Sequence, residues 1–227
     1  MRFDWSNLDA WFSSEPNSKC VLMPELTQSC DSVALNREFF KSLSVFPKKN
    51  RVFPFLWIHP HQLKHSNFGE FTFLGFKFHP SISGTTLDAN TEILELCDKY
   101  RKPILVHCGR DEKSRIDYVL RVNERYDNVR FICAHLGGLA ADLVIRAFDK
   151  MNQANYLDNV FLDTAGCFNR VLIKKAVKIL GDDKVIFGSD RPFQDYEVSL
   201  YTINSCNFTA KAKENILSKN IERILLR

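Results

Sequence analysis

The stretch Val129-Arg130-Phe131-Ile132-Cys133-Ala134-His135 is a short apolar run that ends in a histidine. Two other stretches have the same form, Pro103-Ile104-Leu105-Val106-His107 and Val185-Ile186-Phe187-Gly188-Ser189-Asp190. Each run is rich in β-branched residues and is followed by a Gly or Pro, a pattern typical of a buried strand. We therefore predict three buried strands, each with a polar side chain at its carboxyl end.

Strand-like and helix-like segments alternate along the whole chain. We predict strands over 20–24, 51–58, 72–78, 103–106, 129–134, 159–163 and 185–189, and helices over 32–43, 88–100, 113–125, 140–151, 170–180 and 209–226. Such alternation predicts right-handed βαβ units and a parallel sheet. With a weak eighth strand at Met1–Trp5, the pattern predicts one α/β domain over residues 1–227, a lean (β/α)₈ TIM barrel with a degenerate first strand. A doubly wound open sheet is the alternative, and it is disfavoured because no Gly-x-Gly-x-x-Gly follows the first strand.

The strand ends carry His107, His135 and Asp190. The carboxyl ends of barrel strands are where TIM barrels hold their chemistry. Imidazole and carboxylate groups are ligands for zinc and similar ions, which activate a bound water. Taken singly, each histidine could be a hydrogen-bonded structural residue, and the aspartate could cap a turn. Three coincident strand ends favour a functional site.

Charge and cysteine content exclude several classes of protein. The net charge is +4 and the basic residues are scattered, so we expect no nucleic-acid partner. No apolar run approaches the ~20 residues that span a bilayer, and the N-terminus does not resemble a signal peptide. Seven cysteines, an odd number without a Cys-x-x-Cys pair, predict reduced thiols and a cytoplasmic protein. We interpret Cys108, next to His107, as a packing residue.

Six motifs occur in an order that resembles a known family. They are Gly75-Phe76-Lys77-Phe78-His79-Pro80, Pro103–His107, Ala134-His135-Leu136-Gly137-Gly138, Val160-Phe161-Leu162-Asp163-Thr164, Phe187–Phe193 and Asn220-Ile221-Glu222-Arg223-Ile224-Leu225. From about Cys20 onward the chain is similar to the amidohydrolase-2 group of the amidohydrolase superfamily. That group includes metal-dependent hydrolases and nonoxidative decarboxylases related to aminocarboxymuconate semialdehyde decarboxylase. The resemblance implies a TIM barrel with one divalent metal ion, zinc first and manganese second. It also implies a homodimer as an assembly that members often form.

The resemblance implies roles for the three strand-end residues. His107 would be a metal ligand, and Asp190 would be both a metal ligand and the base that activates water. His135 would be the acid/base residue, or a further ligand where two metals bind.

Four more residues receive roles in the same way. Lys77, His79 and Arg191 would bind the substrate. Lys77 would hold an anionic group of the substrate or a neighbouring carboxylate, and Arg191 would pair with a substrate carboxylate or phosphate or else form a surface ion pair. Asp163 would orient a neighbouring group without touching the metal.

The chain departs from the family at the first strand, which normally carries a metal-binding His-x-His. If Asp4 matches the Asp that precedes this pair, Ser6 and Leu8 stand where the histidines belong. The one His-x-His of the sequence is His59-Pro60-His61, which we predict to be a loop because Pro60 favours a turn.

These observations lead to one main function and two alternatives. We expect a metal-dependent hydrolase that cleaves a C–N or C–O bond of a small, anionic substrate. The first alternative is a nonoxidative decarboxylase on the same scaffold, and the second is a metal-poor relative that binds a ligand or partner without catalysis.

Overall fold

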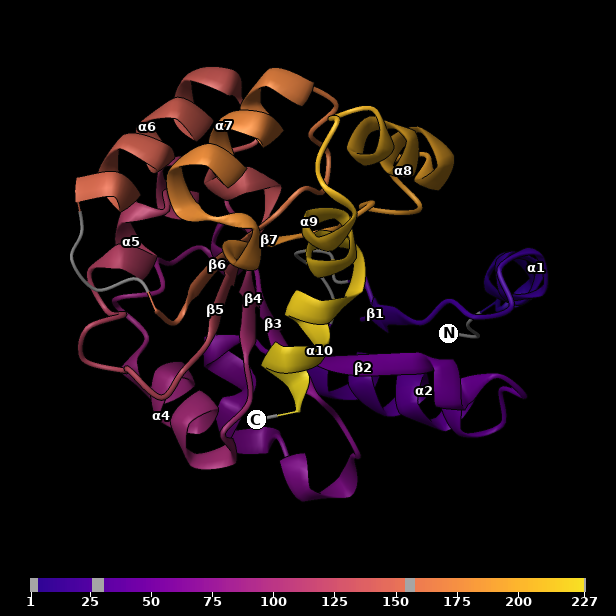
Figure 1. Ribbon diagram of the computed structural model, residues 1–227. Coiled ribbons are helices and arrows are strands. Elements are labelled where there is room, and N and C mark those ends of the chain that lie inside the picture. Colours follow the sequence, from indigo (N-terminus) through magenta and orange to yellow (C-terminus); the bar gives the residue numbers. More distant parts are fainter. Residues whose placement is uncertain (1–3, 26–30, 154–157, 227) are drawn as a thin grey trace. The chain divides into compact units, whose positions relative to one another are not determined.

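The computed structural model describes residues 4–25, 31–153 and 158–226. By its internal contacts the chain divides into two compact units, residues 1–78 and 79–227. In both units short strands alternate with helices along the chain (Figure 1). The single domain expected over 1–227 stays a prediction.

The described residues of the first unit form three parallel strands. Its elements are α1 (Ser6–Ser14), β1 (Cys20–Leu22), α2 (Ser32–Ser44), β2 (Val52–Trp57) and β3 (Gly75–Phe78), with short 3₁₀ helices at Lys49–Arg51, Pro60–His65 and Phe68–Glu70. β2 pairs with β1 and with β3, in registers that place Cys20 opposite Val52 and Phe55 opposite Gly75. These strands were predicted from the apolar runs, and each is shorter than expected.

The weak first strand predicted at Met1–Trp5 is wrong where the structure describes it. Residues 1–3 lie outside the described residues, and Asp4 and Trp5 form no strand. Ser6 and Leu8 belong to α1, and the Asp4 carboxylate accepts the N–H of Ser6 at 2.9 Å where that helix begins. These two residues therefore do not lie at strand positions that could match a first-strand metal site.

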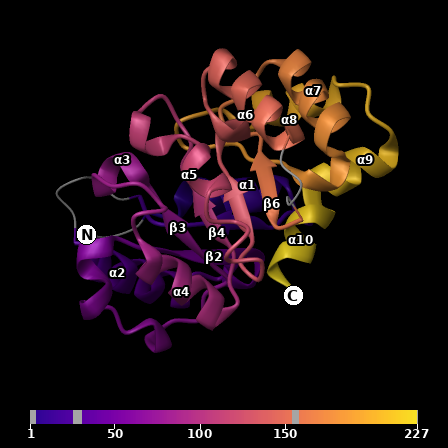
Figure 2. The ribbon, with the colours of Figure 1, turned by 90° about the vertical axis from the view of Figure 1, so that its left-hand side faces the viewer.

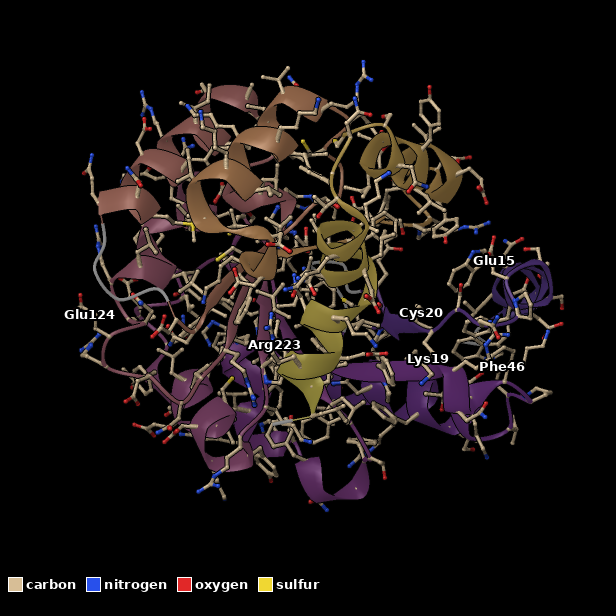
Figure 3. The ribbon with its side chains drawn as sticks, viewed as in Figure 1. Glu15, Lys19, Cys20, Phe46, Glu124 and Arg223 are labelled. Atoms are coloured by element: carbon tan, nitrogen blue, oxygen red, sulfur yellow. The ribbon has the colours of Figure 1, made fainter. Side chains whose placement is uncertain are left out.

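An aromatic cluster forms the core beside α1. Phe12, Phe39 and Phe46 are buried, and Trp5 stacks on Phe46 at 5.2 Å between ring centroids (Phe46 is labelled in Figure 3). The Arg51 guanidinium lies 4.0 Å from the Phe12 ring centroid and donates a hydrogen bond to the Phe12 carbonyl at 2.7 Å. Burial of these rings stabilises the first unit, since each aromatic side chain removes a large apolar area from water.

In the second unit, the part of the chain that the structure describes forms four parallel strands and most of the described helices. Its elements are α3 (Pro80–Ser83), α4 (Thr91–Tyr100), β4 (Ile104–Val106), α5 (Asp117–Leu120), β5 (Phe131–Cys133), α6 (Ala141–Gln153), β6 (Val160–Asp163), α7 (Arg170–Leu180), β7 (Val185–Ile186), α8 (Tyr196–Asn204), α9 (Ala210–Glu214) and α10 (Asn220–Leu225). The strands pair in the order β4-β5-β6-β7. Helices α6 and α7 pack side by side (Figure 2).

Several boundaries differ from the predicted ones for identifiable reasons. Helix α4 begins at Thr91 rather than at Asp88, whose carboxylate instead pairs with Arg121 at 3.1 Å. The helix predicted over 113–125 is regular only in α5. The last predicted strand ends at Ile186, because the Phe187 N–H donates to the Ile216 carbonyl outside the sheet.

The predicted C-terminal helix is interrupted by one π-helical segment, Asn215–Lys219, before α10. Asn220 is fully buried and donates to the carbonyls of Asp182 and Val185, both at 2.7 Å. These bonds tie α10 to β7, which it contacts. None of the described helices is both long and apolar enough to cross a bilayer.

Candidate functional site

Three histidines of the second unit lie in contact, and we call them the imidazole array: His79, His107 and His135. His79 precedes α3, His107 follows β4, and His135 follows β5. The rings of His79 and His107 stack with centroids 3.8 Å apart and planes 11° apart, and the rings of His107 and His135 meet edge to face at 4.9 Å. Parallel strands bring these residues together because their carboxyl ends lie at one edge of the sheet.

Hydrogen bonds link the imidazole array to the backbone. His135 Nε2 lies 3.2 Å from His107 Nδ1, and His135 Nδ1 lies 2.9 Å from the Ala165 carbonyl oxygen. His79 Nδ1 accepts the N–H of Ile82 at 3.4 Å, where it caps α3. His135 is buried, whereas His79 and His107 are half-buried. The three imidazole rings are therefore in contact from the buried His135 to the half-buried His107 and His79.

Asp163 holds the backbone around His135. It is buried at the end of β6, and its Oδ1 accepts the N–H of His135 at 2.9 Å and the N–H of Ala165 at 3.0 Å. One carboxylate oxygen thus binds both the residue that carries the imidazole and the residue whose carbonyl contacts that imidazole.

Two of the predicted site residues have left-handed backbone conformations. His135 has φ 58° and Asp190 has φ 60°. This conformation costs an L-residue about 1–2 kcal/mol, although Asp tolerates it better than most. Such strain concentrates at functional sites, because the surrounding structure must hold it in place. The Asp190 carbonyl accepts the N–H groups of Phe193 and Gln194, which form the turn after β7.

Gly109 leaves room beside the imidazole array. A Cβ added at Gly109 would lie 2.7 Å from His107 Nε2, closer than real side chains approach. Only a glycine at this position lets the backbone pass His107 without displacing the ring.

Two other sequence-predicted residues, Arg191 and Lys77, are also among the described residues. Arg191 is exposed beside the half-buried Asp190. Lys77 lies in β3 of the first unit, where it is buried and its Nζ is 6.0 Å from the centroid of the Trp57 ring. The structure brings together His79, His107, His135 and Asp163, and it leaves the roles given to these residues as predictions.

The His-x-His of the first unit lies at the start of the 3₁₀ helix Pro60–His65. The rings of His59 and His61 are 5.5 Å apart between centroids. Burial, with a smaller contribution from His61, lowers the pKa of His59.

Two thiols lie next to the imidazole array. Cys108 and Cys133 are both buried. A hydrogen bond with the Cys108 side chain, followed by burial and the charge of Asp163, holds the pKa of the Cys133 thiol well above its usual range. Burial of Cys108 agrees with its interpretation as a packing residue.

The donors in the described residues do not fit a resident divalent metal ion. Across residues 4–25, 31–153 and 158–226, no three His, Cys, Asp or Glu side chains are arranged to hold an ion. A catalytic zinc takes three protein ligands and a water. Both ring nitrogens of His135 already lie within hydrogen-bond distance of protein atoms, and so does His107 Nδ1. In this arrangement His135 offers no nitrogen to a metal.

Sequence reasoning missed two contributors to the site. The Ala165 carbonyl is a backbone group, and nothing in its side chain signals that it contacts His135. Gly109 could have been noticed, because a glycine two residues after a strand-end histidine marks a close approach of the backbone.

Comparison with known proteins identifies the family. The sequence matches the family described as Amidohydrolase over residues 63–227, which is more than half of the chain. No curated protein matches the chain in sequence.

Three solved structures illustrate the similarity in fold. 2,6-Dihydroxybenzoate decarboxylase from Rhizobium is 14% identical with a TM-score of 0.76, and the alignment covers 100% of this chain and 89% of that one. 5-Carboxyvanillate decarboxylase from Novosphingobium aromaticivorans, complexed with manganese and 4-hydroxy-3-methoxy-5-nitrobenzoic acid, is 17% identical with a TM-score of 0.75 and coverages of 98% and 80%. A TIM-barrel protein from Bordetella bronchiseptica is 14% identical with a TM-score of 0.74 and coverages of 98% and 83%.

At these identities the structural matches show the fold, and they confirm the predicted α/β TIM-barrel class. The family match confirms the resemblance seen in the six sequence motifs. The chain belongs to the amidohydrolase family.

Proposed function

We propose that this protein is a nonoxidative decarboxylase that acts on a small aromatic carboxylic acid. Two of the similar structures are decarboxylases of substituted benzoates, one of them with a nitrobenzoic acid bound. This supports the decarboxylase alternative from the sequence over the hydrolase that the sequence favoured first. The site would be the imidazole array at the carboxyl ends of β4 and β5.

The observation that carries the proposal is the 3.2 Å contact between His107 Nδ1 and His135 Nε2. Decarboxylation needs a proton at the carbon that loses the carboxylate. The C–C bond breaks, CO₂ leaves, its electron pair stays on the ring carbon, and a proton forms the new C–H bond. Two hydrogen-bonded imidazoles can supply that proton and take a replacement from water. Because His135 is buried and His107 is half-buried, the proton would leave from His107.

Hydrolysis has less support from the same geometry. It requires an activated water, and in this family that activation was expected from a metal held by His107, His135 and Asp190. The nitrogens of His135 are engaged with His107 and Ala165, so this donor set does not assemble. The similar structure with a bound metal holds manganese, which makes manganese the ion to supply in assays.

The test is a decarboxylation assay on the purified protein with 2,6-dihydroxybenzoate and 5-carboxyvanillate, with and without added Mn²⁺. CO₂ release and loss of the acid would be measured together, and a reaction in D₂O would place deuterium on the carbon that lost the carboxylate. We expect His107→Gln and His135→Gln to lower turnover about 100-fold or more, the usual contribution of a general acid.

His65→Gln is the matched control, because His65 is exposed in the first unit. It should keep full turnover. If neither acid loses CO₂ under any metal condition, the decarboxylase proposal fails for these substrates. Binding of the acids without turnover would favour the non-catalytic alternative.

We also propose that the protein works in the cytoplasm. Cys20, Cys97, Cys108, Cys133, Cys167 and Cys206 are free in the described part of the chain, which supports a reducing compartment. The homodimer stays a prediction.

A further inference from the structure

The loop that follows β4 carries an arginine whose charged end is shielded from water. Arg115 is half-buried as a residue, yet its guanidinium nitrogen Nη1 is buried and has no hydrogen-bond partner among the residues that the structure describes. Arginine side chains usually bury their aliphatic stem and keep the charged head in water. A buried N–H without an acceptor is costly, and more so on a charged group, so this nitrogen calls for a partner.

Carboxylates of the same loop do not supply that partner. None of the ion pairs between described side chains includes Arg115. The Asp111 carboxylate accepts the N–H of Lys113, and Glu112 is exposed. A guanidinium N–H bonds most strongly to an anionic oxygen. The buried nitrogen is therefore suited to an anionic group from outside the described chain.

The backbone beside Arg115 is fixed against the segment that follows His107. Ser114 is buried, and its carbonyl accepts the N–H of Gly109 at 3.0 Å. Gly109 is the residue at which the backbone passes close to the His107 ring. The loops after barrel strands are the segments that line the active site of a TIM barrel. This hydrogen bond therefore places the arginine in a loop that borders the imidazole array.

The segments that carry the other two histidines are reached from the same loop. The Ser114 hydroxyl lies 2.7 Å from the hydroxyl of Ser81 in α3, the helix that His79 caps. A Cβ added at Gly137, in the turn after β5, would lie 2.8 Å from Ile116 Cδ1, so the Ile116 side chain packs against that turn. The arginine between these two loop residues thus lies among the segments that hold the whole array.

We propose that Arg115 binds an anionic group of the substrate while the reacting carboxylate lies at the imidazole array. A carboxylate that leaves as CO₂ gives up its negative charge, and an arginine bond to it would stabilise the charged form that has to be lost. A carboxylate that remains on the ring keeps its charge and keeps the bond. The substrate class is therefore an aromatic acid with a second carboxylate, an inference that rests on the proposed decarboxylase function.

The test compares the binding of benzoate and benzamide to the full chain by isothermal titration calorimetry. The two ligands have nearly the same shape, and only benzoate is charged at neutral pH. We expect the wild-type protein to bind benzoate about 10- to 100-fold more tightly, the range of a hydrogen bond to a charged group. Arg115→Met should remove this preference, and Arg115→Lys should keep part of it because the ammonium retains the charge.

Two controls separate binding from a structural role. Arg125→Met is the matched variant, because Arg125 is exposed after α5, and it should keep the preference for benzoate. In urea unfolding without ligand, Arg115→Met should keep the wild-type midpoint, since Nη1 has no partner to lose among the described residues. A lowered midpoint would show that protein groups hold the guanidinium, and it would overturn the proposal. Equal binding of the two ligands by the unmodified protein would overturn it as well, and so would an unchanged preference in Arg115→Met.

Turnover gives a second, separate measurement. With two carboxylates, 5-carboxyvanillate should have a higher kcat/KM than 2,6-dihydroxybenzoate, and Arg115→Met should lower the ratio of the two values about 10-fold or more. The binding experiment needs no turnover, so failure of the decarboxylation assay leaves the benzoate result intact. Turnover of either acid without a benzoate preference would refute the role of Arg115 and leave the decarboxylase function standing.

Discussion

Replacing Gly109 with alanine tests the geometry of the imidazole array most directly. The new methyl group would lie 2.7 Å from His107 Nε2, where ordinary van der Waals contact begins at 3.4 Å. The ring would therefore have to retreat by about 0.7 Å, and it is held on one side by the stack on His79 and on the other by the hydrogen bond to His135. We expect this variant to fold and to lose the regular geometry of the array.

The cost can be worked out from these contacts. Overpacking by one methyl group costs about 1–3 kcal/mol. Weakening one hydrogen bond adds about 0.5–1.5 kcal/mol. We therefore expect Gly109→Ala to lower the free energy of unfolding by about 1.5–4.5 kcal/mol. With a urea m-value of about 2 kcal/mol/M, this moves the midpoint down by about 1–2 M.

Urea unfolding followed by circular dichroism measures this shift. Gly69→Ala is the matched control, because a Cβ there meets its nearest neighbour, the Asn67 side chain, at an ordinary 3.5 Å. In the decarboxylation assay Gly109→Ala should also lose turnover, since the methyl group covers His107 Nε2. Equal midpoints for the two variants, with the His107–His135 hydrogen bond intact by NMR, would refute the reasoning.

Four further outcomes are expected. Gly75→Ala should lower the free energy of unfolding by about 1–3 kcal/mol, measured by urea unfolding, because its Cβ would collide with the Phe55 ring; an unchanged midpoint would contradict the strand register. Burial raises the pKa of Cys20 to about 12, and the pKa of Cys133 is also raised. At pH 8 both thiols of the native protein should therefore react with iodoacetamide far more slowly than the same thiols of the unfolded protein, as measured by mass spectrometry. Rapid labelling of the native protein would show that these sites open. Asp190→Asn should keep the wild-type free energy of unfolding, whereas Asp190→Ala should lower it by about 1 kcal/mol in the same assay, because Asn tolerates the left-handed backbone and Ala does not. Equal free energies of unfolding for the two variants would argue against the positive φ. Elemental analysis after dialysis against a chelator should find well under one manganese or zinc per chain, and a retained stoichiometric ion would show that the donors rearrange to bind it.

The strands and their order could be predicted because their signal is local. Short apolar runs bounded by Gly or Pro identified β4, β5 and β6 to within a few residues, and the alternation with helices indicated parallel pairing. The same local signal was misleading at the N-terminus, where Ser6 and Leu8 lie in a helix and the preceding Trp5 packs on the distant Phe46. The strand propensity of this N-terminal segment is weak, and such a propensity yields easily to tertiary contacts.

The fold class, the family and the strand ends at which His107 and His135 lie could all be predicted from the sequence alone. Those features depend on residue type and spacing along the chain. The contacts of the site appear only in the folded chain: the two imidazoles lie within hydrogen-bond distance, the Ala165 carbonyl contacts the ring of His135, and Asp163 binds the backbone N–H groups of His135 and Ala165. The contacts of His135 with His107, Asp163 and Ala165 join residues 28 to 30 positions apart, and one of them uses a backbone oxygen that every residue possesses. The type of a residue does not reveal a contact with a backbone oxygen, so such a contact can be identified only once the strands are packed together.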